Sequence, residues 1–273
     1  MYKVLTIAGS DSCCGAGVQA DLKVISALGA YSTCAITAIT AQNTLGVSSV
    51  FNVPASVVRQ QIEAVVSDMG SDSLKTGMLV NEEVVEVVCY MFRKHNLNNL
   101  VVDPVITSHK GERLLSEEGV RRLVSDLIPL SSLITPNIPE AEILTHRKIK
   151  DFSAVKDAAI VLFEKGASNV LIKGGHAINH GNVNDTNEKV VDLFYDGKDF
   201  QYFREKRVDS DNVHGTGCMY SAAIATELAK GKDMTGSITT AKKFITKIIK
   251  ESSIPGKGYR LADFSHQTGK ENY

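Results

Sequence analysis

The sequence predicts an α/β fold in which helices cover both faces of a mostly parallel β-sheet. Short apolar runs rich in β-branched residues recur along the chain, and segments with helical periodicity fill the gaps between them. This alternation is typical of parallel strands joined by crossover helices. No repeat or Pro/Gly-rich linker interrupts the pattern, so we expect one three-layer αβα domain over residues 1–273, with an irregular tail from about residue 253.

Each element follows from this pattern in chain order. Strands are predicted at residues 3–8, 33–40, 73–76, 100–105, 133–135, 169–173, 190–195 and 201–207. Helices are predicted at about residues 17–28, 55–68, 82–95, 116–127, 139–145, 154–165, 216–230 and 235–251. The turn Asp196-Gly-Lys-Asp199 joins the last two strands, which predicts a hairpin and therefore an antiparallel edge on the sheet.

Composition excludes several classes of function. The formal net charge is −1 and the pI is about 6.7, and no basic stripe is present, which argues against a nucleic-acid partner. No apolar run approaches the roughly 20 residues that span a bilayer. The five cysteines (Cys13, Cys14, Cys34, Cys89 and Cys218) show no CxxC spacing, as expected for reduced thiols. We therefore expect a cytoplasmic protein that acts on small molecules.

The loop before the helix at 216–230 has the features of an anion cradle. The backbone amides of Gly215, Thr216, Gly217 and Cys218 fall in or beside the first helical turn, where N–H groups have no partner within the helix. These amides and the positive end of the helix dipole favour a phosphate. The two glycines leave room for a phosphate to approach the backbone.

Cys218 places a thiol in the same helical turn. A helix terminus supplies roughly 0.3–1 kcal/mol against about 1.4 kcal/mol per pKa unit, so the dipole alone lowers the thiol pKa by about one unit. A thiolate beside a bound phosphate would also need Mg²⁺ or a lysine nearby. The alternative is a small buried hydrophobic residue, and we assign that role to the other four cysteines.

Further polar clusters follow predicted strands, at the sheet edge where open parallel sheets bind ligands. The glycine-rich loop 9–17 opens the first helix, but it matches neither GxGxxG nor GxxxxGK[ST], so a tight strand-to-helix connection is the more common explanation. Gln42 ends the second strand, where its amide can read the edge of a heteroaromatic ring or cap the next turn.

Two carboxylates and a lysine follow later strands. Asp103 is a candidate Mg²⁺ ligand or a turn-forming residue. Asn137 and Glu140 have the spacing of a capping box, but Glu140 also brings a second carboxylate to the edge that carries Asp103. Lys173 is suited to ATP phosphates, although a surface lysine before a turn is the alternative.

These segments together resemble a known family. The matching motifs are AGSDS (8–12), GAGVQADLK (15–23), ALGAY (27–31), TAQNT (40–44), KTGML (75–79), DPV (103–105), LITPNIPEA (133–141), IKGGH (172–176) and HGTGC (214–218). Nearly the whole chain resembles the hydroxymethylpyrimidine/hydroxymethylpyrimidine-phosphate kinases of thiamine biosynthesis, in the ribokinase superfamily. The resemblance implies a ribokinase-like sandwich, commonly a homodimer, that uses Mg²⁺ and ATP to phosphorylate 4-amino-5-hydroxymethyl-2-methylpyrimidine and then its monophosphate.

The resemblance also implies roles for individual residues. Gln42 would bond the aminopyrimidine edge, and the rest of the substrate site would comprise Asp11, Ala16, Met78 and Val105. Asp103 and Glu140 would organise Mg²⁺. The nucleotide would contact Asn137, Lys173 and His214. The amides of Gly215, Thr216 and Gly217 would stabilise the transferring phosphoryl group, and the Cys218 thiol would deprotonate or position the hydroxyl.

The chain departs from the family pattern in two loops. Cys13 and Cys14 stand where the family has Ser and Gly, and His109 and Lys110 occupy an altered flap after Asp103. The flap lacks the cysteine usual in related pyridoxal kinases. Together with Gln42, that difference favours a pyrimidine substrate. Two alternatives stay open: a pyridoxal kinase of the same fold, and a non-catalytic pyrimidine binder.

Overall fold

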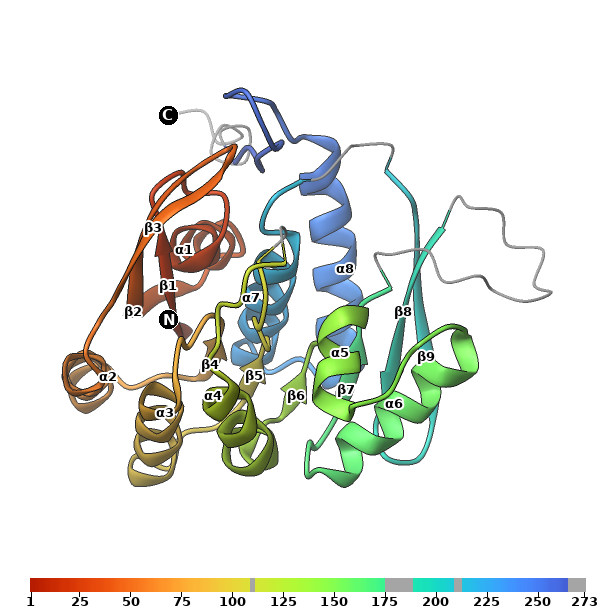
Figure 1. The fold of residues 1–273 in the computed structure, drawn as a ribbon, viewed down its shortest axis with the longest axis horizontal. Coiled ribbons are helices and arrows are strands. Elements are labelled where there is room, and N and C mark those ends of the chain that lie inside the picture. The colour runs from red at the N-terminus through yellow and green to blue at the C-terminus, as the bar shows by residue number, and fades with distance from the viewer. Residues whose placement is uncertain (109–110, 175–188, 209–212, 265–273) are drawn as a thin grey trace.

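The computed structural model describes residues 1–108, 111–174, 189–208 and 213–264, which share one nine-stranded sheet (Figure 1). The strand order is β3-β2-β1-β4-β5-β6-β7-β8-β9. The strands are β1 Lys3–Asp11, β2 Tyr31–Asn43, β3 Gly46–Asn52, β4 Ser73–Thr76, β5 Leu100–Val102, β6 Leu133–Ile134, β7 Val170–Ile172, β8 Lys189–Tyr195 and β9 Phe200–Lys206. His109, Lys110 and His176, which the sequence singled out, lie outside the described residues.

Helices connect the strands, as the alternating pattern predicted. They are α1 Gly17–Ala27, α2 Ala55–Asp68, α3 Glu82–Lys94, α4 Glu117–Arg122, α5 Ile138–Thr145, α6 Phe152–Glu164, α7 Thr216–Ala229 and α8 Met234–Lys250. The helix predicted at 116–127 is shorter than expected. After α4 the chain widens into a π-helical turn, Leu123–Leu127, and then tightens into a 3-10 turn, Ile128–Leu130, which contains Pro129.

Strand pairing confirms the predicted mostly parallel sheet. Neighbouring strands from β2 through β1, β4, β5 and β6 to β7 run parallel. The hairpin β8–β9 forms the predicted antiparallel edge. A second hairpin, β2–β3, forms the opposite edge and was not predicted. Strand β3 is mostly exposed and contains two adjacent serines, Ser48 and Ser49, so it lacks the apolar period of a buried strand.

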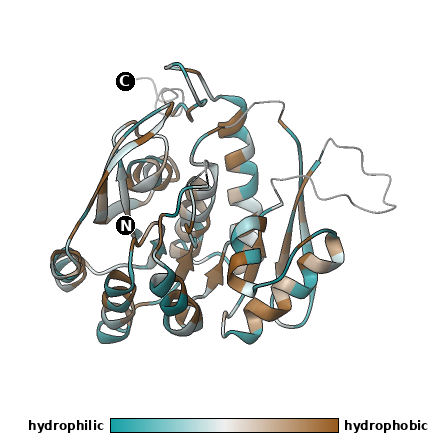
Figure 2. Ribbon diagram, in the orientation of Figure 1, coloured by the Kyte–Doolittle hydropathy of each residue, from teal (hydrophilic) through white to brown (hydrophobic). Residues whose placement is uncertain are grey.

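Two hydrophobic cores lie on the two faces of the sheet, as in the predicted sandwich. Helices α1, α7 and α8 cover one face, and α2 to α6 cover the other. Successive strand residues alternate between them, so Val4 packs under α1 and α7 while Leu5 faces the other layer. The central strands carry hydrophobic residues (Figure 2) and are buried on both faces. Within the described ranges, no helix is long and apolar enough to cross a bilayer.

Residues 253–264, the described part of the C-terminal segment, contain no helix or strand but are anchored to the rest of the fold. Isolated backbone pairings join Ser253 to Leu261 and Val213 to Arg260. The amide of Tyr259 donates to the carbonyl of Thr44 at 2.8 Å. The described part of this segment therefore connects the turn of the β2–β3 hairpin to the loop before α7.

An ion pair is fully buried between β4 and α1. Lys75 Nζ lies 2.8 Å from Asp21 Oδ2, and both side chains have no exposed surface. Thr6 Oγ1 donates to the same carboxylate oxygen at 2.6 Å. Burial alone would lower the pKa of Lys75, but the acidic groups around it, Asp21 first, together raise that pKa above its ordinary value. Because Ser73 Oγ donates to the Ala225 carbonyl at 2.7 Å, β4 passes directly beneath α7.

We predict that removing either partner of this pair strongly destabilises the fold. Asp21→Asn or Lys75→Met should lower the free energy of unfolding by about 3–5 kcal/mol, because each leaves an uncompensated buried charge or donor. Urea denaturation measures the change. The matched control is Lys94→Met, which breaks an exposed pair with Glu63 and should cost only about 0–1 kcal/mol. Equal effects at the two sites would contradict this account.

Candidate active site

The first turn of α7 lies at the carboxyl edge of the parallel strands. Gly215 is the N-cap residue in left-handed conformation, and no side chain among the described residues caps the helix. The first helical hydrogen bond runs from the Met219 amide to the Gly215 carbonyl at 3.0 Å. The amides of Thr216, Gly217 and Cys218 therefore precede the intrahelical ladder and project from its end. This geometry matches the anion cradle that the sequence predicted.

Glycine is required at the start of this helix for a steric reason. Gly215 has φ +78°, and a Cβ there would lie 2.0 Å from the carbonyl oxygen of Gly15. The loop after β1 and the loop before α7 are thus in backbone contact. At Gly217 a Cβ would meet the Lys173 side chain, with Nζ at 3.2 Å and Cε at 4.0 Å, so the lysine ammonium lies against the first turn of α7.

One cluster of charges lies on the β5–β7 side of α7. Lys173 Nζ donates to Asp103 Oδ1 at 2.7 Å, and Ser221 Oγ on α7 lies 3.3 Å from Asp103 Oδ2. Burial would raise the pKa of Asp103, but the ammonium groups of Lys173 and Lys75 outweigh it and lower the pKa below its usual value. The structure therefore joins the predicted metal ligand Asp103 to the predicted nucleotide residue Lys173 as an ionised pair.

Asn137 and Glu140 form the capping box of α5, which was the structural alternative considered for them. The Asn137 side chain accepts from the Glu140 amide at 2.9 Å, and Glu140 Oε2 accepts from the Asn137 amide at 2.8 Å. Burial and the nearby Asp103 charge raise the pKa of Glu140 to about 7, although Lys173 opposes this. Asn137 also pairs with Lys173 through the backbone.

The donor set beside α7 fits a phosphate-bound Mg²⁺. Asp103 and Glu140 are buried carboxylates beside Lys173, and the pKa of Glu140 is still raised there, so an added cation would favour the ionised form of Glu140. No group of three or more His, Cys, Asp or Glu side chains that could hold a metal occurs among the described residues. Mg²⁺ commonly uses one or two carboxylates and completes its shell with water and phosphate oxygens.

A second cluster lies on the β1–β2 side of α7. His214 Nε2 lies 2.7 Å from Gln42 Nε2 and 3.5 Å from Asp11 Oδ2. Asp11 Oδ2 also accepts from the amides of Gly15 and Ala16 at 3.1 and 2.8 Å. Burial would raise the pKa of Asp11, but hydrogen bonds, first from His214 and then from Cys13, lower it to about 2. Asp11 is therefore a carboxylate that orders the loop after β1.

Cys218 differs from the expectation based on the helix dipole. The residue is partly buried, and burial raises the pKa of its thiol to about 11, with Lys75 opposing the increase. Desolvation thus outweighs the dipole, which contributes only about one unit. At neutral pH the group is a thiol.

The structure brings most of the predicted site residues to this edge. His214 Nε2 lies near Gln42 and Asp11, two of the predicted substrate residues. The predicted contact of His214 with the nucleotide stays a prediction. The Met78 carbonyl accepts from Thr37 Oγ1 at 2.6 Å, and the Val105 amide donates to the Asp103 carbonyl at 2.9 Å. Their contact with a substrate ring stays a prediction.

Sequence reasoning missed several residues around the site. Lys75 was noted only as closing a strand, although a lysine in the fully buried strand β4 is itself a signal of a buried partner. The partner, Asp21, could not be chosen from sequence. Tyr259 stacks on His214 with ring centroids 5.8 Å apart, and no motif marked it.

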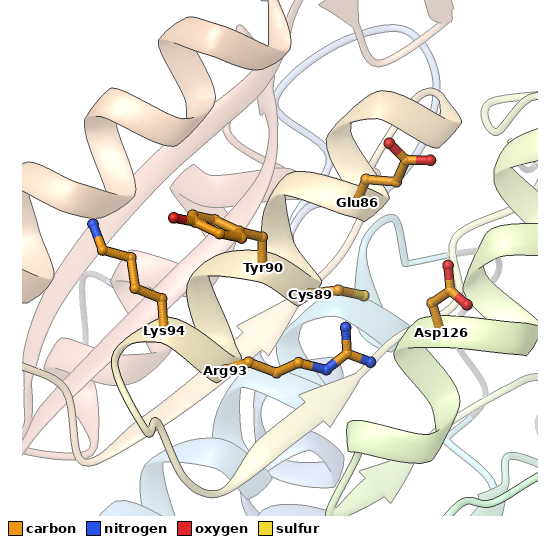
Figure 3. Close-up of a pocket in the computed structure, with 6 residues that line it drawn as sticks. All are labelled: Glu86, Cys89, Tyr90, Arg93, Lys94 and Asp126. Atoms are coloured by element: carbon orange, nitrogen blue, oxygen red, sulfur yellow. The ribbon is translucent and has the colours of Figure 1, made fainter.

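A separate hollow of about 460 Å³ lies on α3 and the π-helical turn after α4 (Figure 3). It is lined by Glu86, Cys89, Tyr90, Arg93, Lys94 and Asp126. Arg122 pairs with both Glu86 and Asp126, and Lys94 pairs with Glu63. The charges around this hollow therefore neutralise one another, and it contains none of the predicted site residues.

Solved structures define the class of protein. The chain is similar to the ADP complex of Bacillus subtilis pyridoxal kinase, with 35% identity and a TM-score of 0.87 over 97% of this chain and 98% of that one. It is also similar to phosphomethylpyrimidine kinase from Clostridium difficile 630, with 38% identity and a TM-score of 0.78 over 92% and 100% of the two chains. The fold and the site thus define a ribokinase-like kinase, a phosphotransferase.

The sequence comparison gives the family. Residues 11–263 match the model of the phosphomethylpyrimidine kinase family. A hydroxymethylpyrimidine/phosphomethylpyrimidine kinase of Aquifex aeolicus is 43% identical over 260 residues, covering 95% of this chain and 99% of the relative. The chain belongs to the phosphomethylpyrimidine kinase family, and the recognition from sequence motifs is confirmed.

We predict that the two cradle glycines differ in their tolerance of alanine. Gly215→Ala should destabilise the protein by more than the roughly 1–2 kcal/mol of left-handed strain, because its Cβ also meets a backbone oxygen. Gly231→Ala is the matched control, since it has φ +83° and nothing within 4 Å. Gly217→Ala should keep the fold but displace the Lys173 ammonium and raise KM for ATP. Thermal unfolding and steady-state kinetics measure these effects; equal destabilisation by Gly215→Ala and Gly231→Ala would contradict the predicted clash.

Proposed function

We propose that this chain transfers the γ-phosphoryl group of ATP to the hydroxymethyl group of 4-amino-5-hydroxymethyl-2-methylpyrimidine, and then phosphorylates the monophosphate to the diphosphate. The observation that carries the proposal is the position of the uncapped first turn of α7 between two clusters. Asp103 and Lys173 lie on one side, and Gln42 with His214 lies on the other. A phosphoryl group held by the α7 amides would pass from the first side to the second.

The Asp103–Lys173 side is the proposed nucleotide end. Lys173 supplies a fixed positive charge 3.2 Å from where a Cβ of Gly217 would lie, so a phosphate on the cradle would meet it. Asn137 pairs with Lys173 through the backbone, and we assign its side-chain amide to the nucleotide as well. Asp103 and Glu140 would hold Mg²⁺, which would neutralise charge on the phosphate oxygens when bound.

The cradle itself supplies the main electrostatic effect. The amides of Thr216, Gly217 and Cys218 are oriented by the helix before any substrate binds, so they stabilise charge on the transferring group without reorganisation. Phosphoryl transfer passes through a loose transition state, and its catalysis depends mainly on positioning and electrostatic stabilisation. Because the pKa of Cys218 is about 11, we assign its thiol to positioning the hydroxyl group.

The Gln42 side is the proposed substrate end. Gln42 is half-buried and ends β2 beside the first loop, where its amide would bond the aminopyrimidine edge. Ala16, Met78 and Val105 would contact the ring. Asp11 orders the loop that carries Ala16, so we assign it a supporting part in this pocket, and we place His214 here as well.

A second candidate activity is phosphorylation of pyridoxal. It is supported by the fold match to a pyridoxal kinase and by the shared chemistry of a six-membered aromatic ring with a CH₂OH group. The third reading, a pyrimidine binder without catalysis, is disfavoured by the Lys173–Asp103 pair beside the cradle, since ring binding requires neither residue.

We further propose a cytoplasmic location, because a reducing compartment suits five free cysteines.

We also propose that the protein is a homodimer that forms through β3. β3 is an edge strand, and its Phe51 and the paired Ile39 are 65% and 52% exposed. An exposed apolar edge is a template for pairing with a second copy. Analytical ultracentrifugation of Phe51→Lys should show monomers, while Tyr90→Lys, at an exposed tyrosine on α3, should stay dimeric; a monomeric wild type would refute the proposal.

Product analysis tests the proposed substrate. Mass spectrometry after incubation with Mg²⁺-ATP and hydroxymethylpyrimidine should detect the monophosphate and the diphosphate, and pyridoxal should give less product. Gln42→Ala should reduce kcat/KM for the pyrimidine by about tenfold or more, the cost of a lost hydrogen bond of about 1.4 kcal/mol, with unchanged thermal stability. Pyridoxal 5′-phosphate as the dominant product, or full pyrimidine activity in Gln42→Ala, would overturn the assignment.

Variants of Cys218 test its assigned role. If the thiol positions the hydroxyl, Cys218→Ser should retain kcat within about tenfold, because a small polar group remains. Cys218→Ala should lose more. A general base would instead contribute about 10²–10⁴-fold, so a loss of that size in Cys218→Ser, together with a thiolate titration in the pH–rate profile, would show base catalysis.

A further inference from the structure

We propose that Asp11, His214 and Tyr259 are positioning residues that fix the orientation of the Gln42 side-chain amide, with its carbonyl oxygen toward His214 and its NH₂ group toward Thr40. An amide has a donor end and an acceptor end of nearly equal size. Whichever end faces the protein decides the hydrogen-bonding pattern that remains for a substrate ring. This inference rests on the proposed function only for the identity of the ring.

The argument starts from Asp11. Its carboxylate already accepts hydrogen bonds from the amides of Cys13, Gly15 and Ala16, and it offers no proton in return. His214 Nε2 lies 3.5 Å from Asp11 Oδ2. An unprotonated ring nitrogen would place two acceptors against each other there. A proton on His214 Nε2 removes this repulsion, and the single N–H faces both the Asp11 carboxylate and the nearer end of the Gln42 amide.

A protonated Nε2 constrains Gln42. The nitrogen of the Gln42 amide lies 2.7 Å from His214 Nε2, which would oppose two N–H donors. A half-turn of the amide places its oxygen there and creates a normal N–H···O bond. The His214 ring thus requires the carbonyl end of Gln42.

Thr40 gives an independent check from the other end of the amide. Its hydroxyl lies 2.9 Å from the Ser10 carbonyl, which only accepts, so the single hydroxyl proton is used in that bond. Thr40 Oγ1 also lies 3.3 Å from the second polar atom of the Gln42 amide. Thr40 Oγ1 has no second proton to donate, so it can only accept a hydrogen bond from Gln42. The Gln42 amide atom that faces Thr40 must therefore be its NH₂ group. Both neighbours select the same orientation.

The segment 258–261 holds the His214 ring in place. Tyr259 stacks on the imidazole with an interplanar angle of 23°. The His214 amide donates to the Arg260 carbonyl at 2.9 Å, and the Tyr259 amide donates to the Thr44 carbonyl two residues after Gln42. A Cβ on Gly15 would lie 2.7 Å from Leu261 Cδ2, so the same segment also packs against the loop after β1.

The fixed amide has a chemical consequence for substrate choice. After the bonds to His214 and Thr40, Gln42 retains one lone pair on its oxygen and one N–H. The free acceptor and the free N–H donor of Gln42 match an exocyclic amino group next to a ring nitrogen, which is the arrangement of a 4-aminopyrimidine. Pyridoxal has no amino group to donate. A freely rotating amide would present donor and acceptor in either order and would discriminate less between the two rings.

The direct test uses the substrate-free protein. Long-range ¹⁵N–¹H NMR of ¹⁵N-histidine-labelled protein should show a protonated Nε2 for His214, assigned by loss of the signal in His214→Phe or by its contacts with the Tyr259 ring. An unprotonated Nε2 overturns the proposal. The measurement does not depend on which substrate the enzyme phosphorylates, so failure here and failure of the proposed function are distinguishable.

A kinetic test follows the same coupling. His214→Phe keeps the ring stack but removes the donor, and should raise KM for the pyrimidine by about tenfold while KM for ATP stays constant. Tyr259→Leu should do likewise, and Tyr259→Phe, which preserves stacking, should behave as wild type. In a Gln42→Ala background, His214→Phe should add no further loss. Additive losses would show that His214 acts independently of Gln42 and would overturn the proposal.

Discussion

The balance of buried charge beneath the first turn of α7 is the constraint on which the site depends. Lys75 neutralises Asp21, and Lys173 neutralises Asp103, but Glu140 is left with only a share of the Lys173 charge. Burial and, after it, the nearby Asp103 charge raise the pKa of Glu140 to about 7 against the opposing charge of Lys173. Such burial is costly unless further positive charge arrives. Under the proposed function, a bound cation would neutralise the carboxylates and a bound anion would accept from the α7 amides.

The sheet determines that these groups meet. The loops that follow parallel strands all lie at the same edge of the sheet, so residues far apart in the chain lie around the same helix end. Contact between the loops is close enough that Gly215 cannot carry a side chain. The Ser73–Ala225 hydrogen bond fixes α7 over β4. Small errors in that packing would shift the amides relative to Lys173, and phosphoryl transfer depends strongly on such positions.

The two sides of α7 differ in chemical character. The β5–β7 side consists of full charges in ion pairs, which suit phosphates and a metal but discriminate little between nucleoside bases. The β1–β2 side consists of an amide, an imidazole and backbone groups, which suit a neutral aromatic ring. The chain is similar in fold to both a pyridoxal kinase and a phosphomethylpyrimidine kinase, so the fold alone does not determine the substrate.

The sequence by itself determined the layered fold, the order of most elements, the β8–β9 hairpin and the glycine cradle, because apolar periodicity and glycine act locally. Neither β3 nor the break after α4 could be predicted, since an exposed edge strand and a π-helical turn lack a local period. Tertiary structure alone decided that His214 lies beside Gln42, that the Tyr259 ring stacks on His214, and that Asp21 is the partner of Lys75. It also reversed the expected pKa shift of Cys218, because desolvation depends on all surrounding atoms whereas the helix dipole follows from local structure.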